Sequence, residues 1–376
     1  MGMTAAAVVS RTDLAHRPQF GWINLLKAGA AQLIVLHHLA FYGPMSDYVQ
    51  PLWPEVLDWL GGNARIAVQV FLVIGGFLVA KSLAPAGRPG IASPVQAVWR
   101  RYAKLAPPFF AATLLAAVLT PVAGIWMLHD SMSAAVTLGQ LSAHALLLHG
   151  VLGYESLSAG AWYVAIDFQL YLLTVLLLWL GGCLAGRRAL AWLMPLAVTV
   201  GIVLSLLYFN LDSGWDNWAP YFFGSYGLGL MAWWASDPAR KPGAMTALMA
   251  MAAVPVLLAL AIDYRSRIAL ALVVACALFL FGRAKTPAQG RAWNVINALG
   301  RISYAVFLVH FPVSLLVNAW FTAYAPLVPA WQALGMLTAW SASLLAGAAF
   351  YRWVEVPLGH FVPLAVAHLR MRPVPG

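Results

Sequence analysis

The feature that most constrains this chain is a series of apolar stretches about as long as a bilayer is thick. A helix needs roughly 20 apolar residues to cross the hydrocarbon core, and 62% of the 376 residues are hydrophobic whereas only 9% are charged. A soluble domain has about 25% charged residues, so this composition excludes a soluble globular enzyme, a disordered chain and a disulfide-stapled secreted module. The sequence predicts ten membrane-spanning helices, near residues 22–43, 65–84, 105–127, 159–180, 189–209, 218–235, 244–262, 266–282, 299–321 and 329–351.

The distribution of basic residues decides between ten spans and eleven. An eleventh stretch, 134–152, is diluted by Gln140, His144 and His149, and counting it as a span would invert every later segment. With ten spans and a cytoplasmic N-terminus, the 22 basic residues include only three in outer segments, Arg65, Arg265 and Arg267. Because basic residues concentrate in cytoplasmic segments, we expect an all-α polytopic membrane protein with about ten transmembrane helices and both termini in the cytoplasm.

This topology also predicts the organisation of the chain. Residues 1–21 form a cytoplasmic N-terminal tail, residues 22–357 a single transmembrane domain and residues 358–376 a cytoplasmic C-terminal tail. The segment 128–158 becomes a long outer loop, and loops of that length are often functional.

Ionisable side chains inside the predicted spans are few, and they are the first functional candidates because placing them in a bilayer is costly. The histidines and carboxylates among them are His37 and His38 in the first span, Asp167 in the fourth and His310 in the ninth. Each could instead make a single interhelical hydrogen bond. The histidines lack the spacing of a metal site, so we expect no metal.

Lys27 and His38 are predicted to share a face of the first helix. His38 lies eleven positions after Lys27, which amounts to three turns plus about 20°, or about 16 Å along the axis. A cation at the cytoplasmic end and a deeper imidazole on the same face suit a long anionic donor whose reactive end reaches inward. Imidazole is the usual general base for a hydroxyl near neutral pH. The alternative interpretation is a snorkelling lysine and a packing histidine.

A second basic cluster opens the third span at Arg101 and Lys104. These residues share a helix face and could hold phosphates, although a simple membrane anchor would have the same composition. Asp167 and His38 are both expected in the outer half of the membrane. If they meet, the carboxylate of Asp167 would fix the tautomer of His38. Asp167 could instead pair with a cation such as Arg65.

Six short motifs, in order along nearly the whole chain, resemble those of the membrane-bound acyltransferase-3 family of O-acyltransferases. They include a basic residue followed by ten residues and then a histidine, a basic pair ahead of the third span, and a closing Glu-x-Pro. The matching residues are Lys27 and His38; Phe71–Phe77; Arg101, Lys104 and Pro107; Trp162–Tyr171; Leu299–Pro312; and Tyr351–Pro357.

The chain departs from the family pattern at five positions. Asn24, Lys27, Gly75, Tyr163 and Asp167 stand where the family usually has Asp, Arg, Ser, Ser and Glu. Lys in place of Arg keeps the charge but loses the bidentate fork, which weakens the grip on a phosphate. Asp in place of Glu shortens a carboxylate arm by one methylene.

The resemblance implies a multi-pass O-acyltransferase of the bacterial inner membrane that uses acyl-coenzyme A, expected to be acetyl-CoA, as the donor. The acceptor would be a sugar hydroxyl in a surface or exported glycan or in its lipid-linked precursor. The expected partners are acyl-CoA, the carbohydrate acceptor and the lipid bilayer, with no nucleic acid and no metal. The implied site residues are His38 as general base and Asp167 in the catalytic centre, and Lys27, Arg101, Lys104, Ser303 and His310 in donor binding.

Two other interpretations remain open from the sequence. A proton-coupled membrane transporter could use His38, Asp167 and His310 as a relay, and it would show transport driven by a proton gradient without thioester consumption. If the protein were a membrane scaffold in glycan assembly, His38→Ala would leave the phenotype unchanged.

Overall fold

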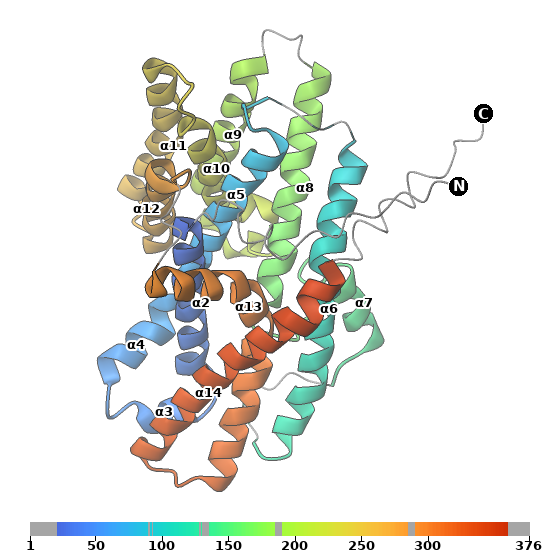
Figure 1. Cartoon of the computed structure of the whole chain (residues 1–376), viewed down its shortest axis with the longest axis vertical. Helices are drawn as coiled ribbons and strands as arrows, with labels where there is room; N and C mark the ends of the chain where they lie inside the picture. The colour runs from blue at the N-terminus through green and yellow to red at the C-terminus, as the bar shows by residue number, and fades with distance from the viewer. Residues whose placement is uncertain are drawn as a thin grey trace, which may run out of the picture.

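The computed structural model describes residues 21–88, 91, 93–127, 129, 135–184, 190–284 and 290–359, and nearly all of them are helical (Figure 1). The predicted fold class, an all-α polytopic membrane protein, is confirmed for these residues. The sides of the membrane on which the two terminal tails lie stay a prediction, because almost all of both tails is outside the described residues. The helices are α2 (Gly21–Phe41), α3 (Met45–Val49), α4 (Pro54–Asn63), α5 (Val68–Leu83), α6 (Pro94–Gly124), α7 (Leu138–Ala145), α8 (Ala161–Leu184), α9 (Leu190–Leu207), α10 (Ala219–Ala235), α11 (Pro242–Ile262), α12 (Ser266–Phe281), α13 (Arg291–Tyr324) and α14 (Pro329–Phe350), with 3₁₀ turns at Ala64–Ala67, Phe209–Leu211 and Ser213–Trp215 and a π-helical turn at Tyr351–Glu355.

Each of the ten predicted spans coincides with a helix. Within the described part of the chain, eight helical segments are long and apolar enough to cross a membrane. The other two predicted spans are α10 and α12, with 17 and 16 residues, which is shorter than most spans. The number of membrane crossings therefore stays a prediction. The eight segments are Gly21–Phe41, Pro54–Leu83, Pro94–Gly124, Ala161–Cys183, Trp192–Leu211, Pro242–Ile262, Arg291–Tyr324 and Pro329–Gly359.

The segment between α6 and α8 folds back against the bundle. Its helix α7 has eight residues, or about 12 Å of helix, which is too short to cross a bilayer. The ring of His144 stacks on Phe109, with 6.2 Å between centroids, and Tyr102 donates a 2.8 Å hydrogen bond to the carbonyl of Ala145. Gly160 ends the segment against Phe307 in the middle of α13. The described part of the predicted outer loop thus reaches into the interior beside α6.

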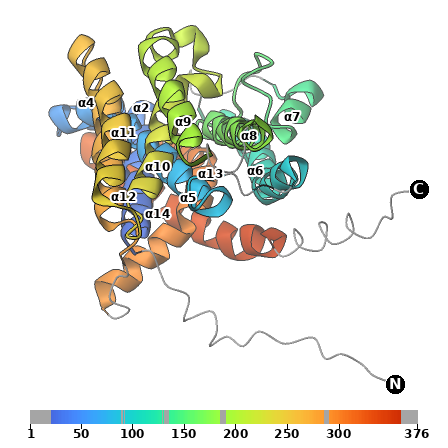
Figure 2. The same cartoon turned by 90° about the horizontal axis from the view of Figure 1, so that it is seen from above.

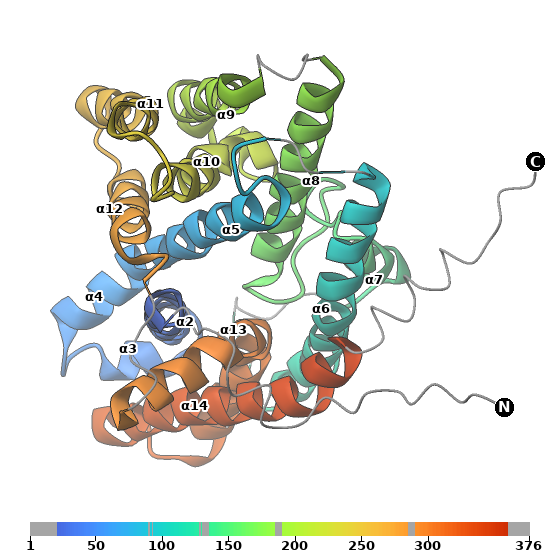
Figure 3. The same cartoon turned by 45° about the horizontal axis from the view of Figure 1, so that its top comes forward.

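Helices α5 and α10 cross with their backbones in contact, and Figure 3 shows α5 passing through the middle of the bundle. A Cβ atom added at Gly76 would lie 1.9 Å from the carbonyl oxygen of Tyr226. One added at Gly229 would lie 1.9 Å from the carbonyl oxygen of Val73. Only residues without a side chain allow this approach, so the two glycines fix the position of the central pair.

Helices α2 and α13 run side by side in the same direction. Near their starts, Asn24 donates a 2.9 Å hydrogen bond to Asn297, and Gly300 lets the backbone of α2 approach closely. Seen from above, α5, α10 and α13 lie in the middle of the molecule, with α6, α7 and α8 on one side and α11 and α12 on the other (Figure 2). The parallel course of α2 and α13 brings residues ten or more positions further along each helix into register.

Candidate active site

Two histidines, His38 and His310, meet at the interface of α2 and α13. The Nδ1 atom of His38 lies 2.6 Å from the Nε2 atom of His310. The two rings are nearly parallel, with 4.9 Å between their centroids and 4° between their planes. Both side chains are buried, His310 completely. We call these two residues the histidine pair.

The hydrogen bonds of His310 determine how the neutral pair shares its protons. The Nδ1 atom of His310 lies 2.9 Å from the carbonyl oxygen of Phe307 and 3.1 Å from that of Val306. Since a carbonyl oxygen only accepts, this Nδ1 carries a proton, and the Nε2 of neutral His310 is an acceptor. His38 therefore donates from Nδ1, which leaves the lone pair on its Nε2. Among the described residues, the side-chain hydrogen bond of His38 runs through Nδ1 to His310, so Nε2 is oriented and available as a base.

The neighbouring His37 has a different environment. Its Nδ1 lies 2.9 Å from the carbonyl oxygen of Leu60, and its ring packs on Phe41 with 5.6 Å between centroids. The imidazole thus joins α2 to the end of α4. This is the interhelical hydrogen bond that the simpler interpretation expected for a histidine inside the membrane.

Asp167 is ion-paired with Arg101, between α8 and α6. Asp167 makes neither of the two expected contacts, with His38 or with Arg65. The side chain that hydrogen-bonds to His38 is His310. The reason is the depth at which α8 begins: Gly160 lies at the level of Phe307, so Asp167 lies past the histidine pair and reaches the basic residues. The guanidinium of Arg101 also lies over the ring of Tyr171, 5.3 Å from its centroid.

Three basic side chains, Lys27, Arg101 and Lys104, gather near one end of α2 and α6; we call them the basic cluster. Lys27 and Lys104 are electrostatic neighbours of each other, and Lys104 also faces Arg101. Glu355 faces both lysines. It stands in the π-helical turn Tyr351–Glu355, an irregularity often found at functional sites.

Several buried polar atoms around the basic cluster have no hydrogen-bond partner. They are the Nε of Arg101, the hydroxyl oxygen of Tyr226 and the Oε2 of Glu355. Buried polar groups are normally satisfied, so this concentration of unpartnered donors and acceptors suits a polar ligand. Sequence reasoning did not single out Tyr226, although a tyrosine inside an apolar span must place its hydroxyl somewhere.

An aromatic layer of Phe71, Tyr163 and Phe307 links the basic cluster to the histidine pair. Their ring centroids are 5.3 to 6.0 Å apart. Phe307 is also 6.1 Å from the ring of His310, and Tyr163 faces both Arg101 and Asp167. A ligand that extended from the cations to His38 would pass these rings.

Ser303 lies seven residues before His310 on α13, as its spacing predicted, but its hydroxyl donates to the carbonyl of Gly300 at 2.9 Å. The side chain is buried. Its predicted role in donor binding remains a prediction. Among the residues that the structure describes, no group of three or more His, Cys, Asp or Glu side chains is placed to hold a metal ion.

Comparison with known proteins identifies the family of the chain. A family model described as an acyltransferase domain matches residues 20–350. The match includes the histidine pair, the basic cluster and Asp167, and it ends before Glu355. Neither a curated protein nor a solved structure matches the chain. Because the family model covers most of the 376 residues, the chain belongs to the acyltransferase-3 family and is a multi-pass membrane acyltransferase.

Proposed function

We propose that this protein is an O-acyltransferase of the bacterial inner membrane that moves an acetyl group from acetyl-coenzyme A to a sugar hydroxyl. The acceptor belongs to a surface or exported glycan or to its lipid-linked precursor. The observation that carries the proposal is the His38–His310 hydrogen bond, which leaves the Nε2 of His38 as an oriented base inside an acyltransferase domain.

In the proposed reaction, the Nε2 atom of His38 takes the proton from the acceptor hydroxyl. The resulting alkoxide attacks the carbonyl carbon of the thioester, and the C–S bond breaks as the new ester forms. The coenzyme A thiolate leaves and recovers the proton from the imidazolium. His310 is a positioning residue in this scheme: by accepting from the Nδ1 of His38, it holds the ring and its tautomer while charge develops.

The basic cluster binds the phosphates of the donor in this proposal. Lys27 and His38 are about 16 Å apart along α2. A donor whose phosphates bind the basic cluster can therefore reach His38 only if a chain of about that length joins the phosphates to its reactive carbon. Coenzyme A has such an arm, and the aromatic layer supplies apolar surface along its path. Asp167 holds the guanidinium of Arg101 in place. Ser303 lies on the same face of α13 as His310.

The test uses membranes that contain the full-length protein and acetyl-CoA labelled in its acetyl group. Release of free coenzyme A and transfer of label to extracted glycan are followed together. We expect both for the wild type, neither for His38→Ala, and wild-type levels for the matched variant His37→Ala. Thioester consumption that survives His38→Ala would contradict the proposed base. Solute uptake driven by a proton gradient, with no thioester consumed, would instead support the proton-coupled transporter.

A further inference from the structure

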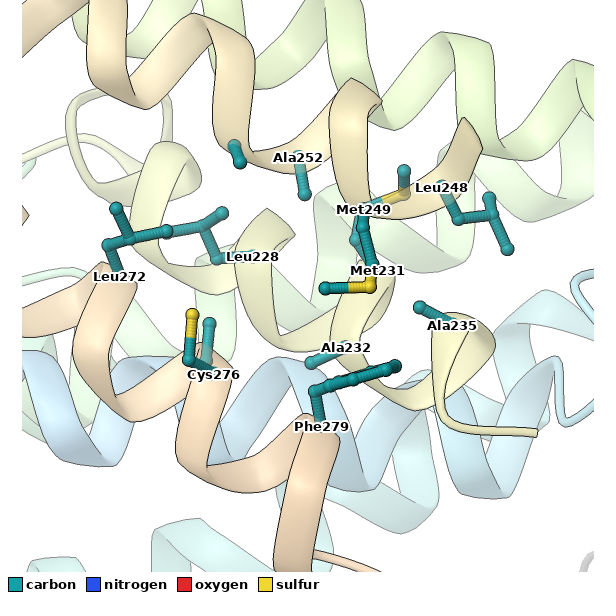
Figure 4. Close-up of a pocket in the computed structure, with 12 residues that line it drawn as sticks. Leu228, Met231, Ala232, Ala235, Leu248, Met249, Ala252, Leu272, Cys276 and Phe279 are labelled. Atoms are coloured by element: carbon teal, nitrogen blue, oxygen red, sulfur yellow. The ribbon is translucent and has the colours of Figure 1, made fainter. Parts of the chain in front are cut away.

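An apolar pocket lies between α10, α11 and α12, which contribute neither member of the histidine pair (Figure 4). Its lining side chains contain only carbon and sulfur. Leu228, Met231 and Leu248 are buried in the pocket, whereas Met249 and Cys276 are exposed at its rim. The pocket therefore opens sideways from the bundle, onto helix surfaces that face lipid in a membrane.

One end of this pocket adjoins an anchored arginine. Ala235 lines the pocket and is the last residue of α10, and the next residue, Ser236, accepts a 2.9 Å hydrogen bond from the Nε of Arg283. Arg283 also donates to the carbonyl of Trp233 at 2.8 Å, and its guanidinium lies 3.6 Å from the centroid of the Trp233 ring. Phe279, at the same end of the pocket, precedes Arg283 by four residues.

A second arginine is fixed beside the first. Arg240 donates to the carbonyls of Trp234 and Ala86, at 2.7 and 3.2 Å. Arg240 and Arg283 are electrostatic neighbours, and one carboxylate, Asp237, faces Arg283. The hydrogen bonds of both arginines go to neutral oxygens, so each uses two of its five N–H donors and neither neutralises its charge in doing so.

Arg240 and Arg283 together carry one more positive charge than the carboxylate of Asp237. An anion placed beside the two guanidiniums would be attracted by both.

We propose that an anionic phospholipid binds at this place, with an acyl chain in the apolar pocket and its phosphate on Arg283 and Arg240. Burial of the chain removes apolar surface from water or detergent, and a phosphate oxygen can accept charge-assisted hydrogen bonds from both guanidiniums. Basic pockets between transmembrane helices bind lipid head groups in this manner. A zwitterionic lipid gains less, because it brings its own cation to a site that is already positive. This inference is independent of the proposed acyl transfer.

Cys276 provides a direct test, because it lines the pocket and is exposed. The full-length protein with Cys183→Ser is purified in detergent, and the rate of Cys276 modification by a maleimide is measured. The added probes are phosphatidylglycerol, phosphatidylcholine with the same chains, and inorganic phosphate. We expect phosphatidylglycerol to slow the modification at the lowest concentration, phosphatidylcholine to require several-fold more, and phosphate alone to have no effect.

The charge of the site is tested with Arg283→Gln and, separately, Arg240→Gln. Each should raise the phosphatidylglycerol concentration needed for half-protection about fivefold, which is the effect of one cation near a lipid surface. Arg291→Gln removes an exposed cation elsewhere, at the start of α13, and should change nothing. Equal protection by the two lipids, protection by phosphate alone, or no shift in either arginine variant would overturn the proposal. A thermal unfolding measurement on each variant shows that the protein tested is folded.

Discussion

His38 and His310 are joined by a 2.6 Å contact between Nδ1 and Nε2, and the other nitrogen of His310 is held by backbone carbonyls of its own helix. These hydrogen bonds place the proton of neutral His38 on Nδ1 and the lone pair on Nε2. The arrangement resembles the base and its orienting partner in other acyl-transfer sites, with an imidazole in the place that a carboxylate often takes.

Replacing His310 should reduce the rate of acyl transfer while leaving donor binding unchanged. His310→Ala removes the acceptor that orients His38, and we expect kcat to fall about 10- to 100-fold with little change in KM for the donor. His310→Gln should recover part of the loss, because its amide oxygen can accept from Nδ1 of His38. Steady-state kinetics on purified protein measure both variants, and a role limited to packing would be indicated if the Gln variant were no better than Ala.

The basic cluster should control donor affinity. Lys27→Ala or Lys104→Ala removes a charge that forms no ion pair among the described residues, so we expect the Kd for coenzyme A to rise about 10- to 100-fold, as for the loss of a charged hydrogen bond. The thermal midpoint should stay within about 2 °C of the wild type. Arg100→Ala is the matched control, since Arg100 is exposed on the same helix. Calorimetric titration with coenzyme A distinguishes the variants, and equal Kd values in all of them would refute the phosphate assignment.

The Arg101–Asp167 ion pair should matter for stability as well as for activity. Asp167→Asn leaves a largely buried guanidinium without its counter-ion, and breaking such a pair typically destabilises by about 3–5 kcal/mol. We expect a lower thermal midpoint for this variant and for Arg101→Ala, and a double variant that is less destabilised than the sum of the two. Strict additivity in that cycle would show that the two residues are not coupled.

The crossing of α5 and α10 should not tolerate a side chain. Gly76→Ala and Gly229→Ala each place a Cβ atom 1.9 Å from a backbone oxygen, and a backbone cannot move aside as a flexible side chain can. We expect a loss of about 3 kcal/mol in the free energy of unfolding, the upper end of the usual cost of overpacking. The control is Gly29→Ala in α2, where nothing lies within 4 Å of the added Cβ, and which should be neutral or stabilising by up to about 1 kcal/mol. Thermal unfolding in detergent measures all three.

The segment that contains α7 should loosen in acid. His149 is fully buried, neither ring nitrogen has a hydrogen-bond partner, and its ring stacks on His144 with 4.0 Å between centroids. Burial, and to a smaller extent the charge of the neighbouring His144, lowers the pKa of His149 from 6.5 to about 3. The unfolded chain takes up a proton on this imidazole near pH 6.5, whereas the folded protein resists protonation down to about pH 3. The free energy of unfolding of the segment therefore falls by about 1.4 kcal/mol for each pH unit below 6.5, down to about pH 3.

Amide hydrogen exchange across residues 137–158 measures this loosening, at pH 7 and pH 5 after correction for the intrinsic exchange rate. Leu157 is a useful reporter because its N–H donates to the Nε2 of His144 at 3.1 Å. His149→Phe keeps an aromatic ring in the stack and removes the titration, so its protection should depend much less on pH. A segment equally protected at both pH values in the wild type would rule out this explanation.

The part of the site that lies on one helix could be predicted from the sequence. The spacing of Lys27 and His38 requires only that the predicted span 22–43 be helical between them, and α2 (Gly21–Phe41) contains both residues. The same holds for Ser303 and His310 on α13. Ten apolar stretches likewise predicted ten helices, because each needs only local composition.

Contacts between helices were not predictable in the same way. The pairing of Asp167 with Arg101 depends on how deeply α8 begins, and that depth is set by the fold of the residues before it, which end against Phe307 at Gly160. Hydropathy placed those residues outside the bundle. The partnership of His38 with His310 depends on the parallel course of α2 and α13, which no pattern within either helix specifies.

The most direct test of the central claim separates donor binding from thioester cleavage in one variant. Purified wild type and His38→Ala are titrated with coenzyme A, and the release of free coenzyme A from acetyl-CoA is then followed in the presence of acceptor glycan. We predict similar Kd values for coenzyme A and a cleavage rate at least about 100-fold lower in His38→Ala, with His37→Ala close to the wild type. Equal cleavage rates in the wild type and His38→Ala would contradict the assignment of His38 as the base.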